Sequence, residues 1–96
     1  MQHRYRLTHD PVRCRYAFDL SDGKAVIDYE PRDERTVMLV HTGVPPRHEG
    51  QGIASELTEA VLTDLEARGM KIVPCCRFIA SYIRRHPRWE RILAEK

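Results

Sequence analysis

Apolar and polar residues alternate along the first part of the chain with the period of two that a half-buried β-strand requires. Residues 12–20 follow this pattern, and Ser21-Asp22-Gly23 then supplies the residue types of a tight turn. The alternation resumes over residues 24–30, which predicts a returning strand and therefore a β-hairpin. A short strand over residues 5–8 and a polar loop over residues 31–35 are further predictions. The side chains expected on the buried face are Val12, Cys14, Tyr16, Phe18 and Leu20 in one strand and Ala25, Ile27 and Tyr29 in the other.

The pattern changes twice in the rest of the chain. Thr36–His41 is almost continuously apolar, which predicts a central strand covered on both faces. Beyond residue 52 the period becomes that of an amphipathic helix, and Arg68-Gly69 supplies the basic last turn and the glycine that end it. The apolar stripe of this helix is Ile53, Leu57, Ala60, Val61 and Leu65, opposite Glu59, Thr63 and Glu66.

The last part of the chain contains prolines that limit its elements. Residues 70–73 predict a strand stopped by Pro74, and residues 76–85 predict a helix that breaks at Pro87, with a last helix after it. The full order is an antiparallel meander joined to a βαβ crossover and followed by C-terminal helices. It predicts an α+β fold with a mixed, mostly antiparallel sheet.

Composition narrows the class of protein. With 96 residues, 42% of them hydrophobic and 31% charged, the chain suits one compact domain spanning residues 1–96. No apolar run approaches the roughly 18–20 residues of a membrane span, and the first residues lack the apolar core of a secretory signal. Three cysteines, two of them adjacent, form no disulfide framework. We therefore expect a cytoplasmic protein that does not associate with a membrane.

The charge distribution leaves several partners open. A formal net charge of +2 is too small to indicate a nucleic-acid-binding protein, although basic residues gather from Arg77 to Lys96. Such a run is most often a solvated face. The alternatives are contacts with the phosphates of a ligand or, at lower weight, a nucleic-acid surface around residues 84–91.

The junction over residues 40–54 is the most informative segment. An apolar strand runs into a loop that contains Gly50 and Gly52, and the loop runs directly into the amphipathic helix. The start of a helix presents unpaired backbone N–H groups at its positive end, so this junction is suited to an anion. A P-loop is excluded because no Gly-Lys-Ser/Thr follows, and a dinucleotide-binding fold would need a parallel framework that this chain lacks. Glycines that only permit a tight turn are the alternative interpretation.

Several motifs resemble one known family. Arg47-x-x-Gly50-x-Gly52 followed by Ile53-Ala54 is similar to the acetyl-CoA-binding signature of the GNAT superfamily of N-acetyltransferases. The chain most resembles a branch of small stand-alone GNAT proteins. The resemblance covers roughly residues 12–92, and the separate motifs follow one another in the order that this branch has. The segments that carry it are His41-Thr42-Gly43-Val44-Pro45, Pro74-Cys75-Cys76-Arg77-Phe78, Tyr82-Ile83 and Arg85-His86-Pro87-Arg88-Trp89.

The resemblance implies acetyl-CoA as the cofactor and a place for each of its parts. Backbone N–H groups at the helix start would hold the pyrophosphate, with the Arg47 cation nearby. The pantetheine arm would lie along Thr42 to Val44, where the strands 36–44 and 70–74 part, and Arg84 or Arg85 would meet the 3′-phosphate. The residues expected to bind acetyl-CoA are Thr42, Val44, Arg47, His48, Glu49, Gly50, Gln51, Gly52, Ile53, Ala54 and Arg85.

The resemblance also implies that the thioester lies near His41 and Cys76. Cys76 would give a proton to the departing thiolate or carry the acetyl group as a transient nucleophile, with its pKa lowered by the helix that follows. His41 would relay a proton, and Tyr82 would act as a general acid. The alternatives are a buried structural cysteine, a strand-end histidine and a tyrosine that only packs in the core. Phe78 and Trp89 are expected in the core, and no metal is expected.

The implied function is transfer of acetyl from acetyl-CoA to an unidentified amine of a small molecule or protein. The alternative is a non-catalytic module that binds CoA or acyl-CoA and offers an open face to a protein partner. Larger GNAT proteins carry helices where this chain has only the Ser21-Asp22-Gly23 turn. The acceptor face is therefore expected to be open, or completed by a protein partner or a second copy of the chain.

Overall fold

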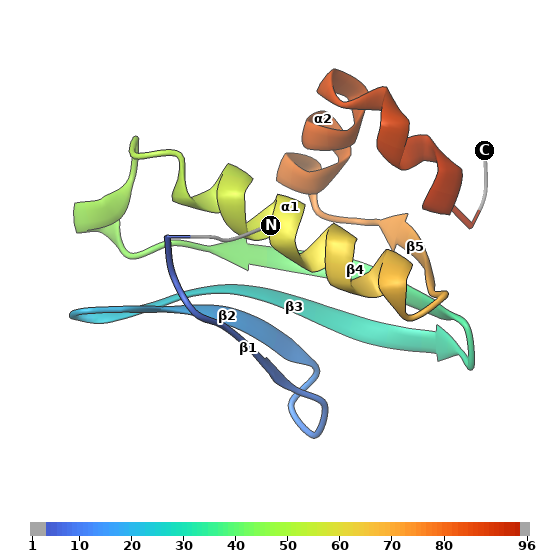
Figure 1. The fold of residues 1–96 in the computed structure, drawn as a ribbon, viewed down its shortest axis with the longest axis horizontal. Helices are drawn as coiled ribbons and strands as arrows, with labels where there is room; N and C mark the ends of the chain where they lie inside the picture. The colour runs from blue at the N-terminus through green and yellow to red at the C-terminus, as the bar shows by residue number, and fades with distance from the viewer. Residues whose placement is uncertain (1–3, 95–96) are drawn as a thin grey trace.

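A computed structural model describes residues 4–94 of the chain, which form a five-stranded sheet with helices. The strands lie in the order β1-β2-β3-β4-β5; the first three pairs are antiparallel, and β4 and β5 are parallel. Helix α1 makes the crossover between the parallel strands, so the predicted α+β fold with a mixed, mostly antiparallel sheet is confirmed (Figure 1). The elements are β1 (Leu7–Asp10), β2 (Arg15–Leu20), β3 (Gly23–Asp33), β4 (Thr36–Gly43), η1 (Pro46–His48), α1 (Ile53–Ala67), β5 (Lys71–Pro74), α2 (Arg77–Arg85) and η2 (Pro87–Ile92).

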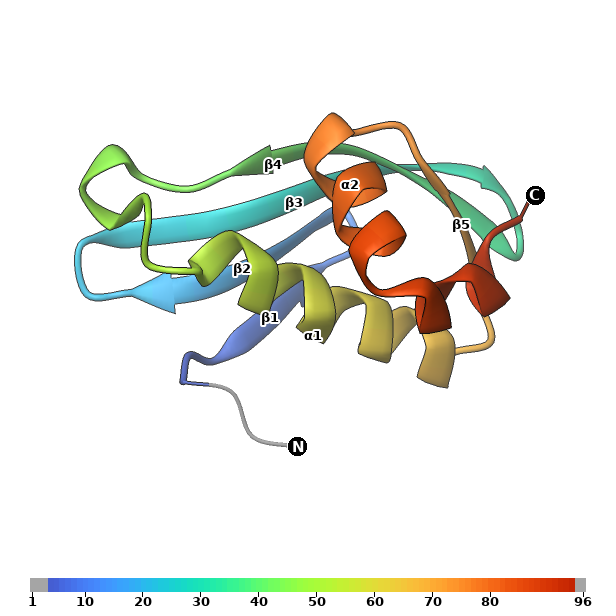
Figure 2. The ribbon, with the colours of Figure 1, turned by 90° about the horizontal axis from the view of Figure 1, so that it is seen from above.

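The helices lie on one face of the sheet, and the core fills the space between the two layers. Figures 1 and 2 show α1 crossing over the sheet with α2 beside it on the same side. Tyr16 and Phe18 of β2 and Ile27 of β3 point into this layer and are fully buried. The prediction that residues 36–41 are covered on both faces is wrong. Val40 is 36% exposed, because no described element packs on the other side of β4.

Helix α1 follows the sequence pattern closely. It begins after Gly52 and ends at Ala67, and Gly69 beyond it has a φ of +73°. This left-handed conformation is the common way to end a helix. The predicted apolar stripe is confirmed, since its members Ile53, Leu57, Ala60, Val61 and Leu65 are all at most 3% exposed.

Several elements differ from the sequence-based predictions in their bounds or their type; β5 and α2 shift by only one residue, to Lys71–Pro74 and Arg77–Arg85. Strand β2 begins only at Arg15, because Cys14 has a φ of +56° that an extended strand does not allow, and Val12 is 92% exposed rather than buried. Strand β3 continues to Asp33, so most of the expected polar loop is strand. The C-terminal segment is the 3-10 helix η2 rather than an α-helix. The expected strand at residues 5–8 is found as Leu7–Asp10.

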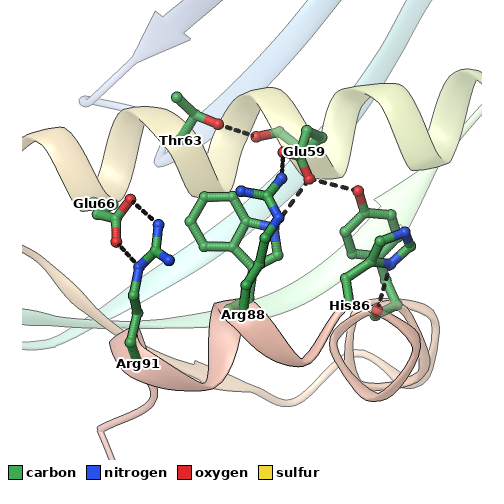
Figure 3. A network of polar contacts seen from close by, with 8 residues as sticks. Glu59, Thr63, Glu66, His86, Arg88 and Arg91 are labelled. Carbon is green, nitrogen blue, oxygen red and sulfur yellow. Dashed lines mark hydrogen bonds and ion pairs between the residues drawn. The ribbon is translucent and has the colours of Figure 1, made fainter.

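The C-terminal segment is attached to α1 through Glu59, as Figure 3 shows. Glu59 Oε1 accepts hydrogen bonds from the Tyr82 hydroxyl at 2.6 Å and from Trp89 Nε1 at 2.9 Å, and Glu59 Oε2 pairs with Arg88. Trp89 is 1% exposed, which confirms its predicted place in the core. The position of Glu59 opposite the apolar stripe predicts that this residue is solvated, but its side chain is only 15% exposed. Glu59 fixes α2 and η2 against α1.

The C-terminus also joins the sheet. Leu93 forms a parallel bridge with Ile72 of β5, and the N–H group of Ala94 donates to the Ile72 carbonyl at 2.9 Å. Within residues 4–94, no helix combines the length and apolar composition that a bilayer crossing needs.

Candidate functional site

The two parallel strands separate in front of α2. Strand β4 pairs with β5 from Thr36 only as far as Leu39, although β4 continues to Gly43. The Leu39 carbonyl accepts hydrogen bonds from the N–H groups of both Cys75 and Cys76, at 3.0 and 2.9 Å, and the chain then turns into α2. Beyond Leu39 the edge of β4 that faces β5 therefore lacks a strand partner among the described residues.

The loop between β4 and α1 leaves backbone donors without partners. Gly50 and Gly52 have φ angles of +83° and +80°, a region that non-glycine residues avoid. The first helical hydrogen bond runs from the Glu56 N–H group to the Gly52 carbonyl at 3.0 Å. Within the described chain no side chain caps α1, and no described acceptor takes a hydrogen bond from the N–H groups of residues 53–55. The positive end of the helix dipole is thus available to an anion.

A pocket of about 400 Å³ lies at this helix start. Eight of the predicted cofactor residues line it, together with Ser55 and Phe78, which the sequence did not assign to the site. Phe78 is partly buried against the core and also faces the pocket, so its prediction as a core residue describes only one side of the ring. The lining residues are Thr42, Val44, His48, Glu49, Gly50, Gly52, Ile53, Ala54, Ser55 and Phe78.

Asp22 organises the loop beside the pocket, and sequence reasoning missed it. Its carboxylate Oδ2 accepts a hydrogen bond from Arg47 Nη1 at 2.7 Å, and its Oδ1 lies 2.7 Å from His48 Nε2. These hydrogen bonds lower the pKa of Asp22 to about 2. His48 also faces Gln51 Oε1 through Nδ1, at 3.3 Å. Arg47 and Gln51 do not themselves line the pocket. The only sequence signal for Asp22 is its place in a predicted turn.

Cys76 is not itself one of the pocket-lining residues, but it contacts Thr42, which is. Its Sγ lies 3.4 Å from Thr42 Oγ1, and the residue directly precedes α2. Burial raises the pKa of the Cys76 thiol, but the Thr42 hydroxyl and the backbone N–H groups of Ile79 and Phe78 lower it by more, so the net shift is downward. The direction agrees with the sequence-based expectation. Cys75 is exposed.

His41 lies on the side of the sheet opposite Cys76. The β3–β4 register shifts between Asp28 and Tyr29, so that His41 pairs with Asp28 while Thr42 pairs with the buried Ile27. Neighbouring residues of a strand point to opposite faces, and Thr42 is on the helix side, where it contacts Cys76. A Cβ atom on Gly43 would lie 3.1 Å from His41 Nε2, which places the imidazole over Gly43 on the uncovered side.

Tyr82 and Arg85 lie on α2 away from the pocket lining. The Tyr82 hydroxyl donates to Glu59, and the ring stacks on His86 at a centroid distance of 4.1 Å. Burial raises the pKa of Tyr82, and the Arg85 guanidinium opposes this shift. Arg85 is exposed in the last turn of α2. The roles that the resemblance gave these two residues stay predictions. Within residues 4–94 no three His, Cys, Asp or Glu side chains gather as metal ligands.

Comparisons with known proteins agree with this architecture. The sequence model of a family described as GCN5-related N-acetyl-transferase matches residues 15–92. Protein NATD1 of Danio rerio is 35% identical over 95 residues, which cover 94% of this chain and 86% of that protein. Protein NATD1 of Homo sapiens is 33% identical over 84 residues, which cover 85% and 74%. A GCN5-like protein of Staphylococcus aureus, solved by NMR in solution, has the same fold, with a TM-score of 0.72 at 20% identity over 96% of this chain and 90% of that one.

Proposed function

Because the chain belongs to the GCN5-related N-acetyltransferase family, we propose that it binds acetyl-CoA and transfers the acetyl group to an amine. One observation carries the proposal. The residues with unpaired N–H groups at the start of α1 line the same pocket as Thr42, near the end of β4 where β5 no longer pairs with it, and Val44, directly after that strand. A linear ligand with an anion at one end and amide groups along its length matches this arrangement.

Different residues of the pocket bind different parts of the cofactor. The N–H groups of Ile53, Ala54 and Ser55, which have no described acceptor, bind the linked phosphates, because they lie at the positive end of α1 and belong to residues that line the pocket. The free edge of β4 near Thr42, and the chain that continues from it to Val44, offer backbone groups to the amides of the pantetheine arm. Nothing lies within 4 Å of a Cβ atom built on Gly50 or Gly52, so the main chain is open to close approach.

Cys76 is the chemical group best placed for the transfer. An amine nitrogen attacks the thioester carbon, the C–S bond breaks, and the sulfur of CoA leaves as a thiolate that takes up a proton, while the amine loses one. The Cys76 thiol, with its lowered pKa, is a stronger acid than an ordinary thiol and gives this proton. In the alternative route its thiolate attacks first, carries the acetyl group as a thioester and passes it to the amine.

The amine acceptor approaches the pocket past the hairpin of β2 and β3. Only a tight turn joins β2 and β3, and Asp22 in that turn contacts the loop before α1. The acceptor side is therefore open, or a protein partner or a second copy of the chain completes it. Both small amines and lysine side chains of proteins fit this access.

Two measurements on the same protein test the proposal. Titration calorimetry with acetyl-CoA and with CoA measures binding, and chromatography of the acetylated products measures turnover on small amines and lysine-containing peptides. We expect binding of both nucleotides and acetylated product from at least one amine class. Failure of acetyl-CoA to bind at millimolar concentration contradicts the proposal.

A non-catalytic CoA-binding module is the second candidate, and the placement of two side chains favours it. His41 lies on the uncovered side of the sheet, and the Tyr82 hydroxyl is engaged with Glu59. Of the three predicted catalytic side chains, only Cys76 adjoins the pocket. Binding of CoA without product from any amine in the panel supports this candidate over the enzyme.

A further inference from the structure

The Asp22 carboxylate holds the side chains of two consecutive residues of the pocket loop. Arg47 and His48 each contact one of its oxygens at 2.7 Å. The Arg47 side chain is 75% exposed and does not line the pocket, whereas the His48 side chain is 18% exposed and does. The guanidinium is therefore mostly in solvent, whereas His48 is the one of the two residues that lines the pocket.

The surroundings of His48 favour its doubly protonated form. Nε2 faces a carboxylate oxygen of Asp22, and Nδ1 faces the amide oxygen of Gln51 at 3.3 Å. Both oxygens are acceptors, so both ring nitrogens donate only when the ring is an imidazolium. The hydrogen bonds with Asp22 and Gln51 raise the pKa of His48, while slight burial and the Arg47 charge oppose the shift. Glu49, the next residue and also part of the pocket lining, is the remaining charged neighbour in the loop.

We propose that His48, held as an imidazolium by Asp22, is the side-chain cation that binds the linked phosphates of the cofactor, and that Asp22 is its positioning residue. This inference rests on the proposed function and gives His48 the role that the signature motif suggests for Arg47. The turn between β2 and β3 thereby becomes part of the cofactor site, although it lies 26 residues before His48 in the chain.

The arrangement makes cofactor affinity depend on pH in a defined direction. His48 is charged below its raised pKa, so binding is strongest there and weakens as the pH rises through that value. In the complex Nε2–H stays with Asp22, while Nδ1–H, which lies at the longer distance of 3.3 Å from Gln51, donates to a phosphate oxygen instead. Loss of this charge-assisted hydrogen bond weakens binding by roughly tenfold or more. Between pH 7 and 9 the phosphates and the sulfur of acetyl-CoA do not change charge, because the phosphate ionisation near pH 6 is complete and the acylated sulfur has no thiol proton. A change of affinity in this range therefore reports on the protein.

The first test measures the charge of His48 directly. NMR titration of the imidazole signals, assigned by their loss in His48→Gln, gives the His48 pKa in wild-type protein, Asp22→Asn and Asp19→Asn. Asp19 is a matched control, since it pairs with Lys24 at 3.5 Å on the same hairpin without touching the loop. We expect Asp22→Asn to lower the pKa, Asp19→Asn to leave it unchanged, and acetyl-CoA to raise it further in wild-type protein. An unchanged pKa in Asp22→Asn overturns the role of Asp22.

The second test measures Kd for acetyl-CoA by calorimetry from pH 7 to 9. We expect wild-type affinity to fall with pH, His48→Gln to bind roughly tenfold more weakly with no pH dependence, and Arg47→Gln to lose less than about threefold. If His48→Gln binds acetyl-CoA with the wild-type Kd and the wild-type pH profile, this inference is overturned, while the proposed function stays intact. Absence of any binding to wild-type protein overturns both.

Discussion

Gly52 shows how a single residue can matter for its backbone alone. Its φ of +80° lies in the left-handed region, which costs other residues roughly 1–2 kcal/mol. No atom crowds the position where a side chain would begin. A side chain there therefore strains the backbone slightly and enters the space that the ligand is proposed to occupy. The two effects are separable, because Gly69 has nearly the same conformation at the far end of α1.

We expect Gly52→Val to abolish acetyl-CoA binding, because the side chain blocks approach to the N–H groups at the helix start. Gly69→Val is the matched control, with a φ of +73° at a position that does not line the pocket. Both variants should lose roughly 1–2 kcal/mol of unfolding free energy in urea denaturation. Retained binding in Gly52→Val at the wild-type Kd would show that the ligand lies elsewhere.

Cys76 offers a second comparison at the residue scale, with the exposed Cys75 as its neighbour. We expect Cys76→Ala to bind acetyl-CoA normally and to lose turnover by about tenfold or more, as removal of a general acid does, while Cys75→Ala keeps both. If the thiol donates a proton, the rate falls as the pH rises through its lowered pKa; if the thiolate attacks, the rate rises there instead. Normal turnover in Cys76→Ala contradicts a chemical role.

Among the elements, α2 matters because Cys76 directly precedes it, and the position of α2 depends on Glu59 of α1. Glu59 accepts hydrogen bonds from two part-buried donors, the Tyr82 hydroxyl and the Trp89 indole, and its side chain is only 15% exposed. Two of the clustered C-terminal arginines, Arg88 and Arg91, also pair with carboxylates of α1. These two arginines of the basic C-terminal segment therefore hold that segment against α1.

Glu59→Ala should lower the free energy of unfolding by about 2–4 kcal/mol, because it leaves donors in the interior without an acceptor. Glu66→Ala is the control, since Glu66 is 34% exposed and pairs with Arg91 at the surface, a contact worth less than about 1 kcal/mol. Urea denaturation compares the two variants. Equal losses would mean that Glu59 does not anchor the C-terminal segment.

The elements that sequence predicted well are those whose patterns are local. The stripe from Ile53 to Leu65 has one periodicity and clear end signals, so α1 is placed to within a residue. Errors arise where one residue or a neighbouring strand overrides the pattern. Cys14 adopts a positive φ that stops the alternation. Strand β4 pairs with Pro31 and Asp33 and so extends β3 into the expected loop.

At the scale of the whole molecule, the proposed ligand joins elements from both halves of the chain. Its pocket includes the end of β4, the start of α1 and Phe78 of α2. A ligand that binds only the folded state stabilises it by about 2.7 kcal/mol at a hundredfold excess over Kd. We expect acetyl-CoA at that excess to raise Tm by roughly 10–20 °C, and Gly52→Val to lose the shift. Calorimetric scans measure both.

The spacing of the site residues along the chain explains which part of the candidate site could be predicted from sequence. The loop from His48 to Ala54 is contiguous, so its glycines and the following helix predict an anion site from local sequence alone. Asp22 and Phe78 come from other parts of the chain, and only the hairpin and α2 bring them to this loop. The side of the sheet that His41 faces depends on the register shift next to Asp28, which no local pattern reveals.

The bridge between Leu93 and Ile72 makes the two borders of the sheet unequal. The last described residues cover part of the β5 border, whereas β1 has one neighbour in the sheet and its outer backbone groups lack a strand partner within residues 4–94. An exposed edge strand can pair with a strand of another molecule. Any self-association by strand addition should therefore involve Leu7–Asp10, and removal of residues 93–96 should open a second route to aggregation along Lys71–Pro74.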